Sequence, residues 1–296
     1  MTGVVLSPGE LAVGRQGASP EMRAGLSRHQ PSLVLAIVVL STWSAWPWLW
    51  QRLSPSLEEG LSLVAAAALI VVLVAPHVIA RRSFLLVPLG PVSVLLLVYA
   101  VAVVVAPDIV AAAAAVVAVL FVVWRAATPT PPPLAFYGLV ALALPVVPSL
   151  QMVLGYPMRV ASAAIAVELL AFQGLAISRN GTLVAINGET VQFDAPCSGV
   201  TTLWTLWLVA LAGGLLFRLK PWRLVTACLL AIGVAIVANA FRAASLIVAE
   251  TSGLLAAAPW MHEGIGLASA ACACAGLWWM IVRLASGTAV ERTDSP

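Results

Sequence analysis

The amino-acid sequence predicts an all-α polytopic membrane protein of about eight transmembrane helices, with an interfacial helix and a short β-hairpin before the sixth span. Of its 296 residues, 62% are hydrophobic and only 9% are charged, and the mean hydropathy is +1.04. A water-soluble domain cannot bury so much apolar surface. The net charge of +3 comes from basic residues scattered in predicted loops, which is typical of topology signals and not of a nucleic-acid-binding surface.

The first five spans follow from apolar runs bounded by charges or prolines. Residues 1–31 are polar and predict a disordered cytoplasmic tail, which precedes one transmembrane domain over 32–284. Because a membrane helix needs about 20 apolar residues, the runs predict spans near 32–50, 60–80, 84–106, 109–124 and 134–154. Four tryptophans close the first run, as in an interfacial aromatic belt.

The next segment, 157–177, is apolar but is interrupted by Arg159, Glu168 and Gln173. A carboxylate at the centre of a span costs roughly 2.5–3.5 kcal/mol on insertion. We therefore predict that this segment lies in the outer interface or re-enters the membrane. Three more spans complete the count, near 198–217, 224–244 and 263–283, and a cytoplasmic tail follows over 285–296.

Basic residues predict which side of the membrane each loop occupies. The basic loop 218–223 belongs in the cytoplasm. With both termini inside, eleven of the 15 Lys and Arg residues fall on the inner side, and eight of the 12 Asp and Glu residues fall outside. We therefore place the protein in the cytoplasmic (inner) membrane, with the starts of spans six and eight at the outer, periplasmic face.

A polar stretch over 178–194 lies between the interfacial segment and span six. Two alternating strands, near 182–186 and 190–193, flank Asn187-Gly188, a dipeptide that strongly favours a two-residue hairpin turn. Polar strands of this length belong in water, so we expect an extracytoplasmic hairpin. It leads to Pro196, in the first turn of span six, where proline is tolerated.

The predicted topology gathers three reactive side chains at the outer face. Cys197 opens span six, where the partial positive charge of a helix N-terminus favours the thiolate. Arg242 closes span seven, and His262 opens span eight. A thiolate can attack a peptide carbonyl, an imidazole can carry the proton, and a guanidinium can stabilise the oxyanion. We interpret these three residues as a catalytic group.

Further polar residues flank the three reactive ones. Asn239 lies three residues before Arg242 and therefore on the same helix face, where it can orient the guanidinium. Each residue taken singly also fits a structural role, such as helix packing or an interfacial anchor. The predicted supporting residues are Asn239, Ser198, Thr201 and Glu263.

The other cysteines, Cys228, Cys272 and Cys274, fall inside apolar runs and are predicted to be small buried residues. Cys272 and Cys274 are two positions apart and point to different helix faces. No His or Cys partner stands near them in the sequence, so we predict neither a disulfide framework nor a metal site, and no cofactor.

Three ordered motifs resemble those of the exosortase/archaeosortase family. They are Ala195-Pro196-Cys197-Ser198-Gly199, Asn239-Ala240-Phe241-Arg242 and His262-Glu263-Gly264. The hairpin and the eight-span layout are similar too, and the motif-bearing part covers about 178–283. Many members read Glu-Ala-Cys-Ser-Gly-Leu-Arg, whereas here Pro196 precedes the cysteine and Thr201 stands in place of that arginine.

The resemblance implies a membrane cysteine transpeptidase, a hydrolase that uses the chemistry of cysteine proteases. Such enzymes act on membrane-anchored proteins with a C-terminal sorting signal: a short motif, often Pro-Glu-Pro (the PEP-CTERM type), a transmembrane helix and a basic tail. Cleavage leaves the product as a thioester on Cys197, and an acceptor such as a lipid or glycan precursor releases it. By the motifs, Arg242 is the cation and His262 the acid/base.

Three alternatives remain from the sequence. An intramembrane cysteine protease passes through the same thioester but transfers it to water. A transporter predicts ionisable residues near mid-membrane, whereas here the charges cluster at span ends. The third alternative is an assembly subunit in which Cys197 has no chemical role. Labelling with an impermeant thiol reagent distinguishes it from an enzyme, because an activated Cys197 should react faster than an ordinary thiol.

Overall fold

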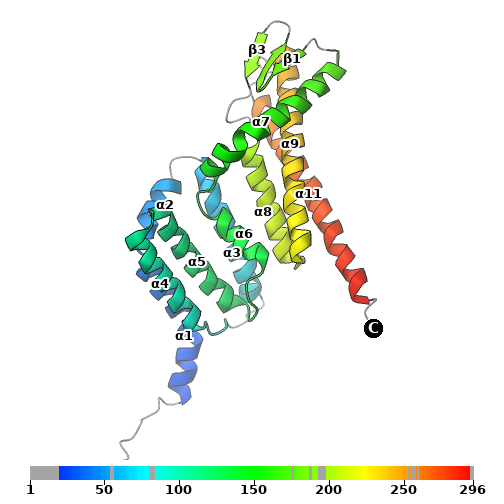
Figure 1. The fold of residues 1–296 in the computed structure, drawn as a ribbon. Helices are drawn as coiled ribbons and strands as arrows, with labels where there is room; N and C mark the ends of the chain where they lie inside the picture. Colours follow the sequence, from blue (N-terminus) through cyan, green and yellow to red (C-terminus); the bar gives the residue numbers. More distant parts are fainter. Residues whose placement is uncertain are drawn as a thin grey trace, which may run out of the picture.

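A computed structural model describes residues 20–53, 57–79, 84–174, 177–186, 189–192, 198–252, 254, 258 and 260–293. The described chain is mostly helical, and its helices form two neighbouring groups with a small sheet at one end (Figure 1). The turn residues Asn187 and Gly188 and the stretch from Phe193 to Cys197 lie outside the described residues.

The first group of helices contains α1 (Pro20–Ser41), α2 (Ala45–Leu53), α3 (Leu57–Ile79), α4 (Leu89–Val105), α5 (Asp108–Ala127) and α6 (Leu134–Leu142). Its core is rich in alanine and leucine around the fully buried Phe136, which meets Trp124 edge to face at a ring-centroid distance of 5.1 Å. Alanine lets neighbouring helices approach closely, as in other membrane bundles.

The start of the chain differs from the expected tail. Helix α1 begins at Pro20, so residues 20–31 are helical. Gln30 donates from Nε2 to the carbonyl of Val87 at 2.8 Å and accepts the amide of Val87 at 2.9 Å. The predicted first span is also bent, because His29–Ser41 and Ala45–Arg52 meet at 76°. The boundaries of the transmembrane domain and its tails otherwise stay predictions.

The expected division near residue 155 is wrong. The structure breaks the chain at 143–146, between α6 and α7 (Val147–Phe172), where Pro145 and Pro148 disfavour helix continuation. Helix α7 then continues for 26 residues through Arg159 and Glu168. Arg159 turns its Nε to the carbonyl of Gly155 at 3.2 Å, and Glu168 is exposed, so neither charge interrupts the helix.

The second group of helices carries the predicted motifs. It contains α8 (Val200–Leu216), α9 (Pro221–Thr251) and α11 (Met261–Thr293), which pack against one another. The predicted spans six to eight are therefore confirmed as helices, and α9 and α11 are longer than expected. Their shared core is a cluster of leucine and alanine with the fully buried Leu203, Leu206 and Leu277.

Hydropathy and helix length together support a polytopic membrane protein. Four described helices, α5, α7, α9 and α11, are long and apolar enough to cross a membrane, and the bent pair α1–α2 is a fifth if it counts as one span. The apolar helices Ser62–Val74 within α3, α4 and α8 are shorter. The count of eight spans therefore stays a prediction.

The polar segment before α8 forms a three-stranded antiparallel sheet in the order β1 (Ile177–Asn180), β2 (Leu183–Ile186) and β3 (Glu189–Gln192). The predicted hairpin corresponds to β2 and β3, paired from Leu183 with Gln192 to Ile186 with Glu189. Strand β1 was not predicted. It joins β2 through a two-residue loop that begins at Gly181, whose φ of +62° suits a tight hairpin turn.

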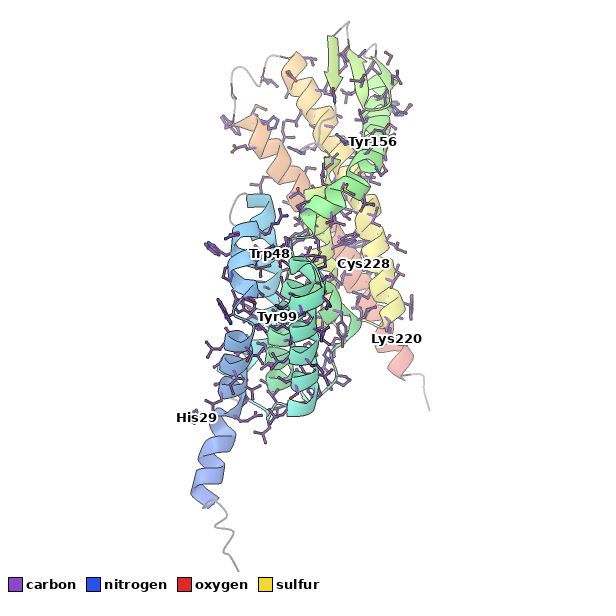
Figure 2. The ribbon with its side chains drawn as sticks, turned by 60° about the vertical axis from the view of Figure 1, so that its left-hand side comes forward. His29, Trp48, Tyr99, Tyr156, Lys220 and Cys228 are labelled. Atoms are coloured by element: carbon purple, nitrogen blue, oxygen red, sulfur yellow. The ribbon has the colours of Figure 1, made fainter. Side chains whose placement is uncertain are left out.

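The sheet is anchored on the C-terminal parts of α7 and α9. Val184 and Ile186 of β2 are buried among Leu170 of α7 and Ala244 and Ile247 of α9. The start of α1 and the end of α11 lie at the opposite end of the molecule (Figure 1). Figure 2 likewise shows His29 and Lys220 toward that end and Tyr156 toward the sheet. The side of the membrane on which each end lies stays a prediction.

Candidate functional site

Gly199 and Asn239 join the start of α8 to α9. Gly199 caps α8 with a φ of +75°, a conformation that favours glycine. A Cβ at this position would lie 3.0 Å from both Cβ and Cγ of Asn239. Asn239 is only 3% exposed. Glycine is therefore required at position 199 for two reasons: the positive φ of the backbone and the close approach of α9.

Ser198 ties the same segment to α7. Its hydroxyl donates to Oε1 of Gln151 at 2.8 Å and accepts the amide of Val200 at 3.3 Å, and the side chain is 3% exposed. Gln151 in turn packs over Gly155, where a Cβ would lie 3.0 Å from its Nε2. Gln151 was not among the residues predicted from the sequence. The sequence does contain a signal for it: Gln151 is a polar residue within an apolar run of a predicted span, and such a residue needs a hydrogen-bond partner.

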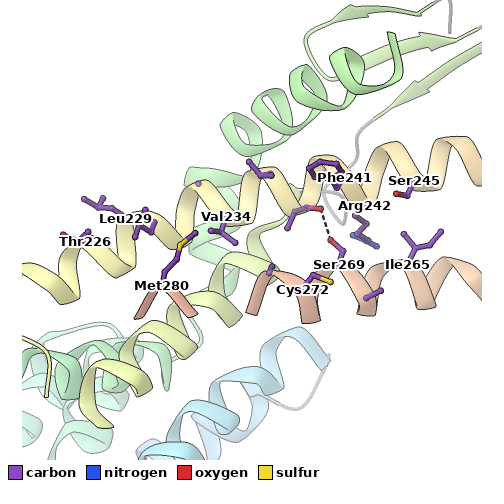
Figure 3. A pocket seen from close by; sticks show the side chains of 16 residues that line it. Thr226, Leu229, Val234, Phe241, Arg242, Ser245, Ile265, Ser269, Cys272 and Met280 are labelled. Carbon is purple, nitrogen blue, oxygen red and sulfur yellow. Dashed lines mark hydrogen bonds between the residues drawn. The ribbon is translucent and has the colours of Figure 1, made fainter. Parts of the chain in front are cut away.

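Arg242 lies between α9 and α11. Its side chain is half-buried, and its Nε is buried with no hydrogen-bond partner among the described residues. A Cβ on Gly266 of α11 would lie 3.3 Å from that Nε and 3.8 Å from Nη2. The guanidinium thus rests against helix backbone that has no side chain to shield it, and Figure 3 shows Arg242 directed toward α11.

One further hydrogen bond fixes the two helices beside Arg242. Ser269 of α11 donates from Oγ to the carbonyl of Ala238 at 2.9 Å, which is the dashed line in Figure 3. The bond and the Gly266 contact set the register of α9 against α11 at the level of Arg242. The half-buried guanidinium of Arg242, with an Nε that has no partner in the described part of the chain, is suited to bind an acceptor oxygen of another molecule.

His262 and Glu263 lie in the first turn of α11 and are exposed. His262 precedes Gly266 by four residues, so it stands on the same helix face and about 6 Å further along the helix axis. His262 is therefore one turn closer to the start of α11 than Gly266, the residue that Arg242 contacts. The exposed Glu263 lies near the positively polarised start of α11, where a carboxylate is favourable.

The structure places the remaining predicted residues as follows. Thr201 is half-buried in the first turn of α8, and its carbonyl accepts the hydroxyl of Thr205 at 2.9 Å. Cys197 lies outside the described residues. The first two motifs meet where Gly199 approaches Asn239, and Arg242 lies against Gly266, four residues after His262 of the third motif.

Among the described residues, no three His, Cys, Asp or Glu side chains lie close enough to hold a metal ion. The site that the described part presents consists of an amide, a guanidinium and an imidazole, on helices that also carry hydroxyl groups. These groups can bind and polarise a carbonyl and move a proton.

The comparisons with known proteins agree with the motif order. A family model described as transmembrane exosortase matches residues 26–279, which is most of the chain and includes all three motifs. No curated protein and no solved structure matches the chain. The match extends over the first group of helices, where the sequence analysis relied on hydropathy alone. This protein therefore belongs to the transmembrane exosortase family.

Proposed function

We propose that this chain is a cysteine transpeptidase that cleaves a C-terminal sorting signal at the outer face of the inner membrane. Membership of the exosortase family supports a membrane transpeptidase in general terms. The observation that carries the specific proposal is Arg242, whose buried Nε lacks a partner in the described part of the chain and lies against Gly266, one helix turn after His262. Such a cation needs an acceptor, and a reacting carbonyl supplies one.

In the proposed reaction the thiolate of Cys197 attacks the carbonyl carbon of the scissile peptide bond. The carbonyl oxygen becomes an oxyanion, which the guanidinium of Arg242 stabilises in surroundings of low dielectric. Protonated His262 gives its proton to the leaving amine as the carbon–nitrogen bond breaks, and the product remains as a thioester on Cys197.

In the second half of the reaction an acceptor hydroxyl or amine replaces the sulfur. Neutral His262 takes the proton from the acceptor, the new bond forms at the carbonyl carbon, and Cys197 leaves as the thiolate. A lipid or glycan precursor at the outer leaflet is the proposed acceptor. Asn239 and Gly199 position the start of α8 against α9, and Ser198 does the same against α7.

The proposal is tested with a reporter protein that ends in Pro-Glu-Pro, an apolar helix and an arginine-rich tail, produced together with the enzyme in bacterial cells. Cys197→Ala should abolish processing, because no other group supplies the thioester. Arg242→Ala should slow it about 10²–10³-fold, as does removal of an oxyanion donor in other enzymes. Cys274→Ala, which changes a cysteine away from the motifs, should process like the unaltered enzyme.

The product identifies the reaction. Mass spectrometry should find the new C-terminus joined to an acceptor, whereas a free carboxylate identifies a protease that transfers to water. Hydroxylamine should release the reporter from Cys197 if a thioester accumulates. Full processing by Cys197→Ala would refute covalent catalysis by this residue.

A further inference from the structure

A long apolar groove runs along the seam between α9 and α11. Its volume is about 980 Å³, and most of its lining side chains are aliphatic (Figure 3). On α9 the lining begins at Thr226 and passes Gly233 and Val237 to reach Arg242. The lining continues to Ser245, so the guanidinium that the proposed mechanism uses lies near one end of the groove.

The length of the groove matches a membrane. Thr226 and Arg242 are sixteen residues apart on one helix, which is about 24 Å at 1.5 Å per residue. The hydrocarbon core of a bilayer is about 30 Å thick. A molecule that fills the groove therefore extends through most of the apolar layer, with one end near Arg242.

The shape of the groove fits one side of an α-helix. Gly233, Ala238 and Ala268 line the wall, and such small residues let the backbone of a second helix approach closely. Acyl chains need no such close approach.

We propose that this groove holds the transmembrane helix of the protein substrate. The helix would run parallel to α11 and antiparallel to α9, so that the peptide bond preceding it reaches Arg242. The guanidinium of Arg242, whose side chain lines the groove, then donates to the carbonyl oxygen of that bond. This inference rests on the proposed function and adds where the substrate binds and in which direction.

Two native cysteines make the proposal testable. Cys272 is exposed and lines the groove, whereas Cys274 packs against the core shared by α8, α9 and α11. The reporter described above is given a single cysteine at successive positions of its apolar helix. It is combined with Cys197→Ala enzyme, which keeps the substrate intact, and the membranes are oxidised with a lipid-soluble copper catalyst.

Disulfides should form between Cys272 and those reporter positions that share one helix face, recurring every three to four residues. Cys272→Ala should remove them, and Cys274→Ala should not. Two results would overturn the proposed docking and leave the proposed function intact. One is an equal yield of disulfide from Cys272 and from Cys274. The other is the absence of any cross-link to a reporter that the unaltered enzyme processes. A reporter that the unaltered enzyme leaves unprocessed counts instead against the proposed function.

A second experiment fills the groove. Gly233 and Gly90 both have open space where a Cβ would stand, but only Gly233 lines the groove, since Gly90 lies at the start of α4. Gly233→Leu should reduce reporter processing about tenfold or more, because overpacking a contact surface is unfavourable. Gly90→Leu should process like the unaltered enzyme. If Gly233→Leu is equally active, or if photo-cross-linkers at Val237 capture only lipid, the substrate helix does not bind here.

Discussion

Gly199 offers the sharpest test of how the site is assembled. Alanine at this position must adopt a φ of +75°, which costs a residue with a Cβ about 1–2 kcal/mol. The new methyl group also lies 3.0 Å from Cβ and Cγ of Asn239, in contact with a buried side chain that cannot swing away. Overpacking of this kind typically adds about 1–3 kcal/mol. Gly199→Ala should therefore lower the free energy of unfolding by about 2–5 kcal/mol.

Gly174 provides a matched control, because it has a φ of +83° but open space around its missing Cβ. Gly174→Ala should lose only the backbone part, about 1–2 kcal/mol. The assay is unfolding of the purified variants in mixed micelles by increasing SDS, followed by reporter processing in cells. Processing by Gly199→Ala should fall about 10²-fold, as expected when a reacting group is misplaced by about 1 Å.

The difference between the two variants isolates the contact between α8 and α9. If Gly199→Ala and Gly174→Ala lose the same free energy of unfolding, Asn239 does not press on the start of α8. The close packing of the first two motifs, on which the proposed site depends, is then incorrect.

Three other predictions concern the neighbours of the site. Gly266→Ala places a methyl group 3.3 Å from Nε of Arg242 and should slow processing about tenfold, with little change in SDS unfolding; an unchanged rate would show that the guanidinium can shift freely. Arg242→Lys should restore little of the activity lost in Arg242→Ala, because a lysine cannot present a planar set of donors; rates near the unaltered enzyme in the reporter assay would mean that charge alone suffices. Gln151→Ala should destabilise the protein by about 1–3 kcal/mol, because the buried hydroxyl of Ser198 loses its acceptor; Gln151→Glu, which keeps an acceptor, should lose less in the same SDS titration.

Much of the helical content was predictable because apolar composition acts locally. Runs of Leu, Val and Ala long enough to cross a membrane must satisfy their backbone groups within the segment, and a helix does so. The Asn-Gly turn likewise predicted the pairing of β2 and β3. Strand β1 lacks this signal, because Asn180 is paired in the strand and the two-residue loop to β2 is Gly181-Thr182.

The course of α7 was not predictable from insertion energies. A carboxylate at mid-helix was treated as a barrier, but Glu168 is exposed near the sheet end of a helix whose other face packs on α9. That packing includes a hydrogen bond from the hydroxyl of Ser162 to the carbonyl of Ile236 at 3.3 Å. Contacts between segments more than 70 residues apart leave no periodic pattern in the sequence.

The residues of the candidate site were chosen from the sequence, but their environment was not. Motif order and topology singled out Asn239, Arg242 and His262. The contact of Gly199 with Asn239 and the closeness of Gly266 to Arg242 depend on how three helices cross. Gln151 is assigned to the site only because it accepts a hydrogen bond from Ser198.

The sequence by itself determined that this chain is a membrane protein, which residues are chemically reactive and in what order they occur, because composition and motifs are properties of the chain alone. Only the tertiary structure decided which glycines are contact points, that one nitrogen of Arg242 is buried without a partner in the described part, and that a groove leads from it along α9 and α11. The physical reason is that close packing is set by the shapes of helices that meet in space, and a hydropathy pattern records only which face of each helix avoids water.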